Sequence, residues 1–212
     1  LPGIGTIEDL EEAKSCGAQV VRIATHVTEA DIAIQHLKAA ARLDMMPVGF
    51  LMMSHMASPE KILEQAKIFV DAGAAYVNIA DSAGYMTPDD VRTRISLLAE
   101  QLPIPVGFHS HNNLGLAVAN ALAAVESGAE YIDVTCRGLG AGAGNAQGEV
   151  LAGVLQRLGY NTGIDFYGLM DVAEEIVEPL MHRPQVIQSA PLMLGYAGVY
   201  SSFLLHTYKA AE

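Results

Sequence analysis

Three stretches of the chain read alike: Cys16-Gly17-Ala18-Gln19-Val20-Val21-Arg22-Ile23-Ala24, Ala72-Gly73-Ala74-Ala75-Tyr76-Val77-Asn78-Ile79-Ala80 and Ser127-Gly128-Ala129-Glu130-Tyr131-Ile132-Asp133-Val134-Thr135. Their glycines lie 56 and 55 residues apart. Each Gly-Ala pair follows a helical pattern, so we expect the glycine to end a helix in the left-handed conformation. The short apolar run after it is rich in β-branched residues and is typical of a strand that is buried on both faces.

A second repeat, Pro47-Val48-Gly49-Phe50 and Pro105-Val106-Gly107-Phe108, falls between the members of the first. Together the two repeats predict five strands, which start near residues 20, 48, 76, 106 and 131. Amphipathic helices are predicted over residues 28–43, 58–72 and 87–101, with Thr28, Ser58 and Thr87 as their N-caps. Two more helices are expected over residues 6–15 and 147–158.

The strict alternation of strands and helices favours an α/β fold, a (β/α)₈ TIM-type barrel, over a doubly wound open sheet. We expect about six of the eight βα units, including a weak strand near residues 164–167, and a strand remnant at residues 1–4. The barrel is therefore expected to be incomplete at its N-terminus and the chain to be truncated. Residues 1–165 are predicted to form a partial TIM-barrel catalytic domain, and residues 166–212 the start of a helical C-terminal region.

The composition excludes several classes of protein. Among 212 residues, 12 Lys and Arg stand against 24 Asp and Glu, and 51% of the residues are hydrophobic. A disordered chain would be poorer in apolar residues, and a nucleic-acid-binding protein would need a basic face. No apolar run approaches the ~18 residues that span a bilayer, so no membrane partner is expected. Two widely separated cysteines favour a reducing, cytoplasmic setting.

Polar residues recur where the predicted strands end. They are Thr25-His26, Ser54-His55, Asp81-Ser82, His109-Ser110-His111 and Cys136-Arg137. A barrel enzyme builds its active site at this end of the strands, so the pattern predicts a catalytic site there.

His109 and His111 form the sharpest pair in that set. Residues i and i+2 of a strand point to the same side, so both imidazoles can bind one metal ion. No third ligand is obvious, and Asn145 and Asp81 are the candidates. The glycine-rich run from Gly138 to Gly144 is interpreted as a tight loop that brings Asn145 to the barrel axis rather than as a dinucleotide fingerprint.

The string Gly107-Phe108-His109-Ser110-His111-Asn112-Asn113-Leu114-Gly115, followed by Ile132-Asp133 and by Gly138-Leu139-Gly140 to Gly144-Asn145, resembles the metal-dependent lyase and synthase barrels. That group includes 3-hydroxy-3-methylglutaryl-CoA lyase and isopropylmalate synthase. Three further stretches, Leu1-Pro2-Gly3-Ile4-Gly5-Thr6, Arg22-Ile23-Ala24-Thr25-His26 and Leu194-Gly195-Tyr196-Ala197-Gly198-Val199-Tyr200-Ser201-Ser202-Phe203, are similar to the 4-hydroxy-2-oxovalerate aldolases of aromatic meta-cleavage pathways.

The resemblance implies a role for particular residues. His109 and His111 match the metal-binding histidines, and His109 also contacts the substrate. Ser82 matches a substrate-binding serine, and Tyr200 matches a catalytic tyrosine that reaches the substrate from the C-terminal region. The family's Arg-Asp pair and its nearby histidine have no counterpart in this sequence.

The same resemblance implies a cofactor, a reaction and a partner. The cofactor is a divalent metal, with Mn²⁺ favoured over Mg²⁺ or Co²⁺. The reaction is a class II cleavage of a small 2-oxo acid, which yields pyruvate and acetaldehyde. The partner is an acylating acetaldehyde dehydrogenase, bound as a heterotetramer that channels the aldehyde.

Two alternatives remain open. One is an acyl-CoA enzyme of the 3-hydroxy-3-methylglutaryl-CoA lyase or isopropylmalate synthase type, which would share the His109 and His111 pair. The other is a catalytically inactive fragment, suggested by the missing Arg-Asp unit. On that ground we expect the 212-residue chain itself to bind metal weakly and to turn over slowly or not at all.

Overall fold

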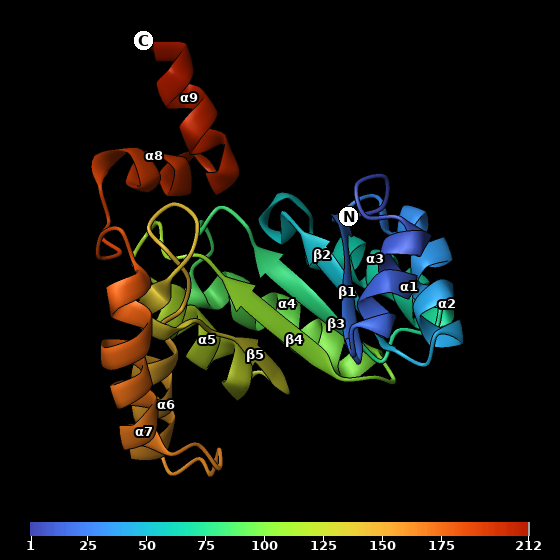
Figure 1. The fold of residues 1–212 in the computed structure, drawn as a ribbon, viewed down its shortest axis with the longest axis horizontal. Helices are drawn as coiled ribbons and strands as arrows, with labels where there is room; N and C mark the ends of the chain where they lie inside the picture. The colour runs from blue at the N-terminus through green and yellow to red at the C-terminus, as the bar shows by residue number, and fades with distance from the viewer. Residues whose placement is uncertain (212) are drawn as a thin grey trace.

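The computed structural model describes residues 1–211 and shows an open sheet of five parallel strands (Figure 1). The strands are β1 (Val20–His26), β2 (Met46–Met52), β3 (Tyr76–Asp81), β4 (Val106–Ser110) and β5 (Tyr131–Asp133). Their order in the sheet is their order in the chain, and every neighbouring pair is parallel. A doubly wound sheet would reverse its strand order at a switch point, so the barrel-type arrangement is confirmed and the doubly wound alternative is wrong.

The helices that alternate with the strands along the chain cover one face of the sheet (Figure 1). The α-helices are α1 (Ile7–Ser15), α2 (Ile34–Arg42), α3 (Pro59–Asp71), α4 (Pro88–Gln101), α5 (Ala117–Glu126), α6 (Gly148–Arg157), α7 (Phe166–Asp171), α8 (Ser189–Ala197) and α9 (Leu204–Ala211). Short 3₁₀ turns are η1 (Ala30–Ala33), η2 (Ser54–Met56), η3 (Cys136–Gly138), η5 (Glu178–Leu180) and η6 (Ser201–Phe203), and one π-helical stretch is η4 (Val172–Val177).

Local capping explains why several helices begin where the sequence predicts. Ser58 accepts a hydrogen bond from the Lys61 amide at the start of α3. Thr87 and Asp90 form a reciprocal capping box at the start of α4. Both helices carry proline at their first position, where the missing amide hydrogen costs nothing.

Thr28 is not the N-cap of a helix, so that prediction is wrong. Its hydroxyl and amide both contact Nδ1 of His26, which holds Thr28 in the turn after β1. The chain continues as η1, whose Ala30 amide donates to Oε1 of Gln65 at 3.0 Å. The side chain of a distant residue on α3 thus replaces the local cap.

The weak strand expected near residues 164–167 is also absent, and so is the strand remnant at residues 1–4. Asp165 instead accepts a hydrogen bond from the Gly168 amide and caps α7. Residues 1–5 form a turn closed by a bridge between Pro2 and Gly5. Neither segment has a neighbouring strand with which to pair.

The two faces of the sheet differ in chemistry. Alternate strand residues such as Ile23, Leu51, Ile79 and Phe108 point to the helices and form the main apolar core. The register aligns the other set across the opposite, inner face: Arg22, Phe50, Asn78, His109 and Asp133. The polar residues of this inner face are therefore available for binding rather than for core packing.

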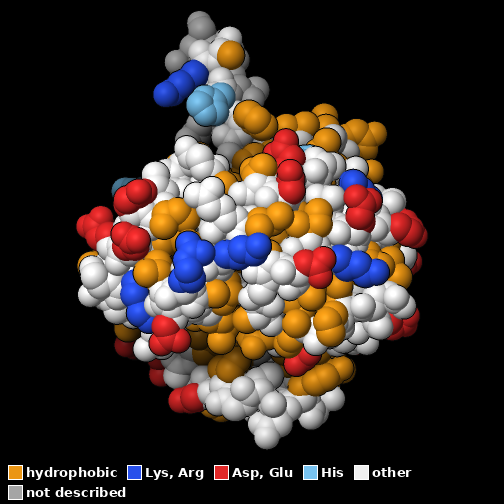
Figure 2. All heavy atoms as spheres, turned by 90° about the vertical axis from the view of Figure 1, so that its right-hand side faces the viewer, with side chains coloured by type: hydrophobic (Ala, Val, Ile, Leu, Met, Phe, Trp, Pro, Cys, Tyr) orange, Lys and Arg blue, Asp and Glu red, His pale blue; other side chains and the backbone are white. Residues whose placement is uncertain are grey.

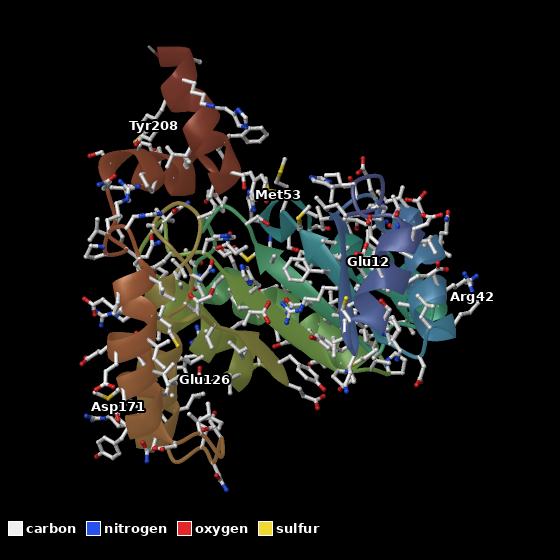
Figure 3. The ribbon with its side chains drawn as sticks, viewed as in Figure 1. Glu12, Arg42, Met53, Glu126, Asp171 and Tyr208 are labelled. Atoms are coloured by element: carbon white, nitrogen blue, oxygen red, sulfur yellow. The ribbon has the colours of Figure 1, made fainter. Side chains whose placement is uncertain are left out.

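The C-terminal helices lie beyond the carboxyl end of the sheet (Figures 2 and 3). In Figure 2, which looks at the side carrying α1 and α2, the C-terminal helices stand above a surface of mixed charged and apolar side chains. In Figure 3, Met53 lies between the carboxyl end of the sheet and those helices. No helix in the described part of the chain is long and apolar enough to cross a membrane.

Candidate metal centre and substrate site

His109 and His111 lie together at the carboxyl end of β4. Their ring centroids are 5.1 Å apart and their planes meet at 70°. This confirms the geometric argument that residues two apart on a strand share a side. The rings are half-buried, so a ligand held between them would be partly shielded from water.

The Nδ1 atom of each ring has a partner that can only accept. Nδ1 of His109 lies 3.1 Å from Oδ2 of Asp133, and Nδ1 of His111 lies 3.0 Å from the backbone carbonyl of Asp81. Each Nδ1 therefore carries a hydrogen, which leaves Nε2 of each ring as the nitrogen that can bind a metal. Metal-binding histidines are held by this kind of partner, which fixes the tautomer and the ring orientation.

The local electrostatics fix the protonation states of His111 and Asp133. Burial, with a smaller contribution from His109, lowers the pKa of His111 to about 4, so its imidazole is neutral at physiological pH. Burial acts to raise the pKa of Asp133, but hydrogen bonds from His109 and Arg22 outweigh it and hold that pKa below its usual value. Asp133 is therefore a carboxylate, which matches its role as acceptor.

A largely buried carboxylate such as Asp133 needs a counter-charge on the inner face. Arg22 supplies it by donating to both carboxylate oxygens of Asp133. The guanidinium also lies 5.7 Å from the centroid of the Phe50 ring, and Asn78 donates a weaker hydrogen bond to Asp133 at 3.3 Å. His109 thus rests on a chain of contacts that reaches across the sheet to β1.

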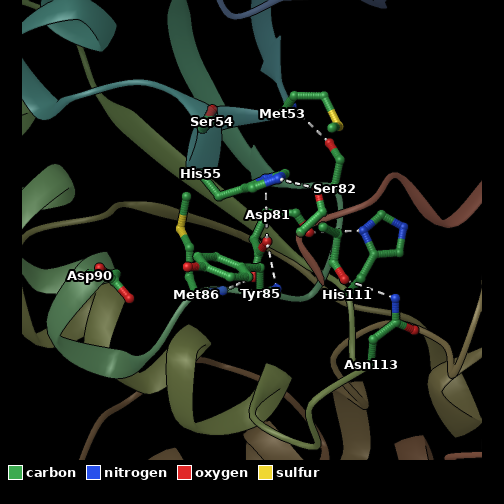
Figure 4. A network of polar contacts seen from close by, with 12 residues as sticks. Met53, Ser54, His55, Asp81, Ser82, Tyr85, Met86, Asp90, His111 and Asn113 are labelled. Carbon is green, nitrogen blue, oxygen red and sulfur yellow. Dashed lines mark hydrogen bonds and ion pairs between the residues drawn. The ribbon is translucent and has the colours of Figure 1, made fainter. Parts of the chain in front are cut away.

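Asp81 is not a third metal ligand, contrary to one of the two possibilities drawn from the sequence. Its side chain lies on the helix-facing side of β3, where the amides of Tyr85 and Met86 donate to it at 3.0 and 2.9 Å (Figure 4). Burial raises the pKa of Asp81, although these hydrogen bonds oppose the rise. Only its backbone carbonyl reaches the histidine pair.

Asn145 lies beside His111, to which it is joined by an antiparallel bridge. Its Nδ2 donates to the carbonyl of Leu139 at 3.2 Å. Its Oδ1 is buried and has no hydrogen-bond partner among the described residues, which is costly unless a ligand completes it. Two imidazoles and this amide oxygen suit a divalent cation. In the described part of the chain, no group of three or more His, Cys, Asp or Glu side chains is arranged so that it could hold a metal ion by itself.

Ser82 is buried at the carboxyl end of β3, close to His111 (Figure 4). Its Oγ accepts a hydrogen bond from the Met53 amide at 2.9 Å. Met53 adopts the left-handed conformation, with φ of 57°, which is strained for a residue other than glycine. Backbone strain at the end of β2 thus accompanies an amide that is aimed at the Ser82 hydroxyl.

Tyr200 lies in the C-terminal region, just before η6, and its ring meets that of Phe203 edge to face at 6.1 Å. The next residue, Ser201, is buried, and its Oγ lies 3.5 Å from the carbonyl of Ser82. The structure therefore brings the backbone at Tyr200 to the loop that carries Ser82.

Two residues of this site were quoted in the sequence motifs but given no role: Arg22 and Asp133. The side of the strand that each occupies follows from the alternation of apolar and polar residues. Their partners come from other strands, since Asp133 pairs with His109 through the register of β4 and β5. A reliable register for the predicted strands would have suggested this pair.

Comparison with known proteins gives consistent matches. The family model described as HMGL-like matches residues 1–176, and the model described as a DmpG-like communication domain matches residues 185–212. Over all 212 residues, the chain is 69% identical to a 4-hydroxy-2-oxovalerate aldolase of Moorella thermoacetica and 62% identical to one of Carboxydothermus hydrogenoformans. The chain spans 63% of the length of each of these relatives.

Two solved structures share the fold of this chain at low sequence identity. The N-terminal domain of a proposed aldolase from Bacteroides vulgatus aligns with a TM-score of 0.81 at 27% identity, covering 96% of this chain and 69% of that one. The HMG-CoA lyase of Bacillus subtilis aligns with a TM-score of 0.76 at 20% identity, covering 88% of this chain and 71% of that one. The second likeness shows the fold alone.

Proposed function

Since this chain belongs to the HMGL-like family, we propose that the protein is a divalent-metal-dependent aldolase. Its substrate would be 4-hydroxy-2-oxovalerate, cleaved to pyruvate and acetaldehyde during the degradation of aromatic compounds. The observation that carries the proposal is the pair His109 and His111, whose ring centroids lie 5.1 Å apart and whose Nδ1 atoms are both anchored, which leaves the Nε2 atoms as the candidate metal ligands. The identity to the two aldolases supports the substrate.

His109 and His111 would hold the metal, and the unpartnered Oδ1 of Asn145 is suited to contact it directly or through water. Imidazole and oxygen ligands favour Mn²⁺, with Mg²⁺ and Co²⁺ as further possibilities. When bound, the ion supplies Lewis-acid chemistry at the 2-oxo group of the substrate. The contribution of the protein is to keep His111 neutral and to hold both imidazoles in a fixed orientation.

Ser82, His109 and Tyr200 would contact the substrate. Because Ser82 Oγ already accepts from the Met53 amide, its own hydrogen is free to be donated to an oxygen of the 2-oxo acid. His109, fixed by Asp133, would bind at the same carboxyl edge of the sheet. Tyr200 would act as the catalytic residue that approaches from the C-terminal region and limits the access of water.

The chain would comprise two functional parts: a partial catalytic barrel over residues 1–165 and a partner-docking region over residues 166–212. The second part bears exposed apolar side chains, namely Leu192, Met193, Tyr196 and Tyr208. The match to a communication domain supports an acylating acetaldehyde dehydrogenase as the partner, in a cytoplasmic heterotetramer that passes the aldehyde between active sites.

The proposal is tested by measuring pyruvate release from 4-hydroxy-2-oxovalerate by the intact protein, with added Mn²⁺ and after removal of metal by a chelator. We expect metal-dependent release, and a loss of at least 100-fold in His109→Ala, in line with the loss of a metal ligand and a substrate contact. His182→Ala, which alters an exposed histidine, is the matched control. Cleavage of an acyl-CoA substrate alone, or full activity without metal, would contradict the proposal.

A further inference from the structure

Buried polar contacts attach the C-terminal segment 195–201 to the loops that carry Ser82 and His111. We propose that Asn113, Ser201 and His55 are positioning residues that hold Tyr200 over the substrate site. The inference rests on the proposed function, because it assigns these residues to the substrate contact made by Tyr200. These three side chains would contact neither the metal nor the reacting atoms of the substrate.

Asn113 is the centre of this arrangement and is completely buried. Its Nδ2 donates to the carbonyl of Ala83 and to Oγ of Ser201, both at 2.8 Å. Its Oδ1 accepts from the amide of Ala143 at 2.9 Å. One amide side chain thereby joins the loop after β3, the loop after β4, the glycine-rich loop before α6 and the C-terminal segment.

Three glycines allow the segments to approach Asn113 this closely. A Cβ atom at Gly195 of α8 would lie 2.8 Å from Cβ of Asn113. A Cβ atom at Gly142 would lie 2.5 Å from Oδ1 of Asn113, and one at Gly84 would lie 2.7 Å from the backbone nitrogen of Asn113. A side chain at any of these positions would force neighbouring atoms to shift, so the three glycines allow the segments to pack closely around Asn113.

His55 provides a second attachment on the other side of Tyr200. Its Nε2 lies 2.9 Å from the carbonyl of Gly198, which can only accept, so the imidazole donates to the residue that ends α8. The ring is 4% exposed and packs against Tyr85 with centroids 5.5 Å apart. Figure 4 shows it next to Asp81 and Ser82.

The two attachments bracket Tyr200, at Gly198 two residues before it and at Ser201 one residue after it. The backbone of Tyr200 is therefore fixed relative to Ser82, whose carbonyl lies 3.5 Å from Ser201 Oγ. Catalytic groups lose much of their effect when displaced by about 1 Å, a change that can cost on the order of 100-fold in rate. Weakening one attachment should therefore lower kcat without altering the metal centre.

The test is a double-mutant cycle in the intact protein with Mn²⁺, using Ser201→Ala, Tyr200→Phe and the double variant. We expect Ser201→Ala to lower kcat about tenfold while the Mn²⁺ affinity, measured by calorimetry, stays within twofold of wild type. In the Tyr200→Phe background the same substitution should lower kcat less than twofold, because Ser201 acts through Tyr200. A merely structural role would give the same loss in both backgrounds.

Ser202→Ala, which removes the same hydroxyl from an exposed neighbouring position, is the matched control and should behave as wild type. Asn113→Ala is avoided as the main variant because it would leave several buried partners unsatisfied. Equal losses of kcat in both backgrounds, or no loss in Ser201→Ala, would overturn the inference. A wild-type protein that releases no pyruvate would instead contradict the proposed function, so the two failures are distinguishable.

Discussion

At the scale of single residues, the candidate metal centre depends on the contact between His109 and Asp133. In Asp133→Asn the side chain keeps its size but loses the charge that pairs with Arg22 and fixes the His109 tautomer. Loss of such a partner typically weakens metal binding by about 10- to 100-fold, and we expect that decrease in Mn²⁺ affinity by calorimetry. Asp89→Asn, at a side chain that is 93% exposed, is the control. Equal affinities in the two variants would show that Asp133 does not support the metal site.

The pKa of His111 makes a second prediction at this scale. A folded pKa of about 4 lies below the ordinary histidine value of 6.5, so between these values the unfolded chain binds more protons than the folded one. The metal-free protein should therefore lose stability as the pH falls from 6.5 towards 4, by up to about 1.4 kcal/mol per pH unit. Urea unfolding at several pH values measures this slope. The slope should be smaller in His111→Asn but unchanged in His182→Asn, and an unchanged slope in the first variant would contradict the assignment.

At the scale of secondary-structure elements, α4 owes its start to the capping box of Thr87 and Asp90. Thr87→Ala removes the side chain that accepts from the Asp90 amide, which should lower the free energy of unfolding by about 0.5–2 kcal/mol in urea. Thr93→Ala is the matched control, because Thr93 is exposed on the same helix and bonds only the carbonyl one turn earlier. Alanine is the stronger helix former there, so this variant should be neutral or slightly stabilised. Equal effects would mean that the cap is not needed.

The same elements show which parts of the fold and the site were predictable. Ser58 and Thr87 could be predicted as caps from short sequence patterns, because each bonds a backbone amide only three residues further along the chain. The prediction that Thr28 is a cap was wrong because the backbone amide of Ala30 donates instead to the side chain of Gln65, 35 residues away. The side shared by His109 and His111 followed from the period of a strand. The partner of His109 did not, since it depends on the register between two strands.

At the scale of the whole molecule, Arg22 on β1 and Asp133 on β5 link the two outermost strands of the sheet across its inner face. The sheet is therefore curved enough for side chains of its first and last strands to meet, as barrel geometry requires. Arg22→Ala would leave Asp133, whose side chain is 14% exposed, without its bidentate partner. Loss of the partner of a largely buried acceptor costs roughly 1–3 kcal/mol, and we expect that decrease in the free energy of unfolding.

Arg42→Ala, at an exposed arginine on the outer helix α2, is the control and should change the stability by less than about 0.5 kcal/mol (Figure 3). Arg22→Lys separates charge from geometry, because an ammonium group cannot donate to both carboxylate oxygens in the fork-like manner of a guanidinium. We expect it to restore part of the stability and little of the Mn²⁺ affinity, since Asp133 would no longer be held in place for His109. If Arg22→Ala and Arg42→Ala unfold at the same urea concentration, the contact across the sheet contributes nothing to the fold, and the curvature must come from strand twist and helix packing alone.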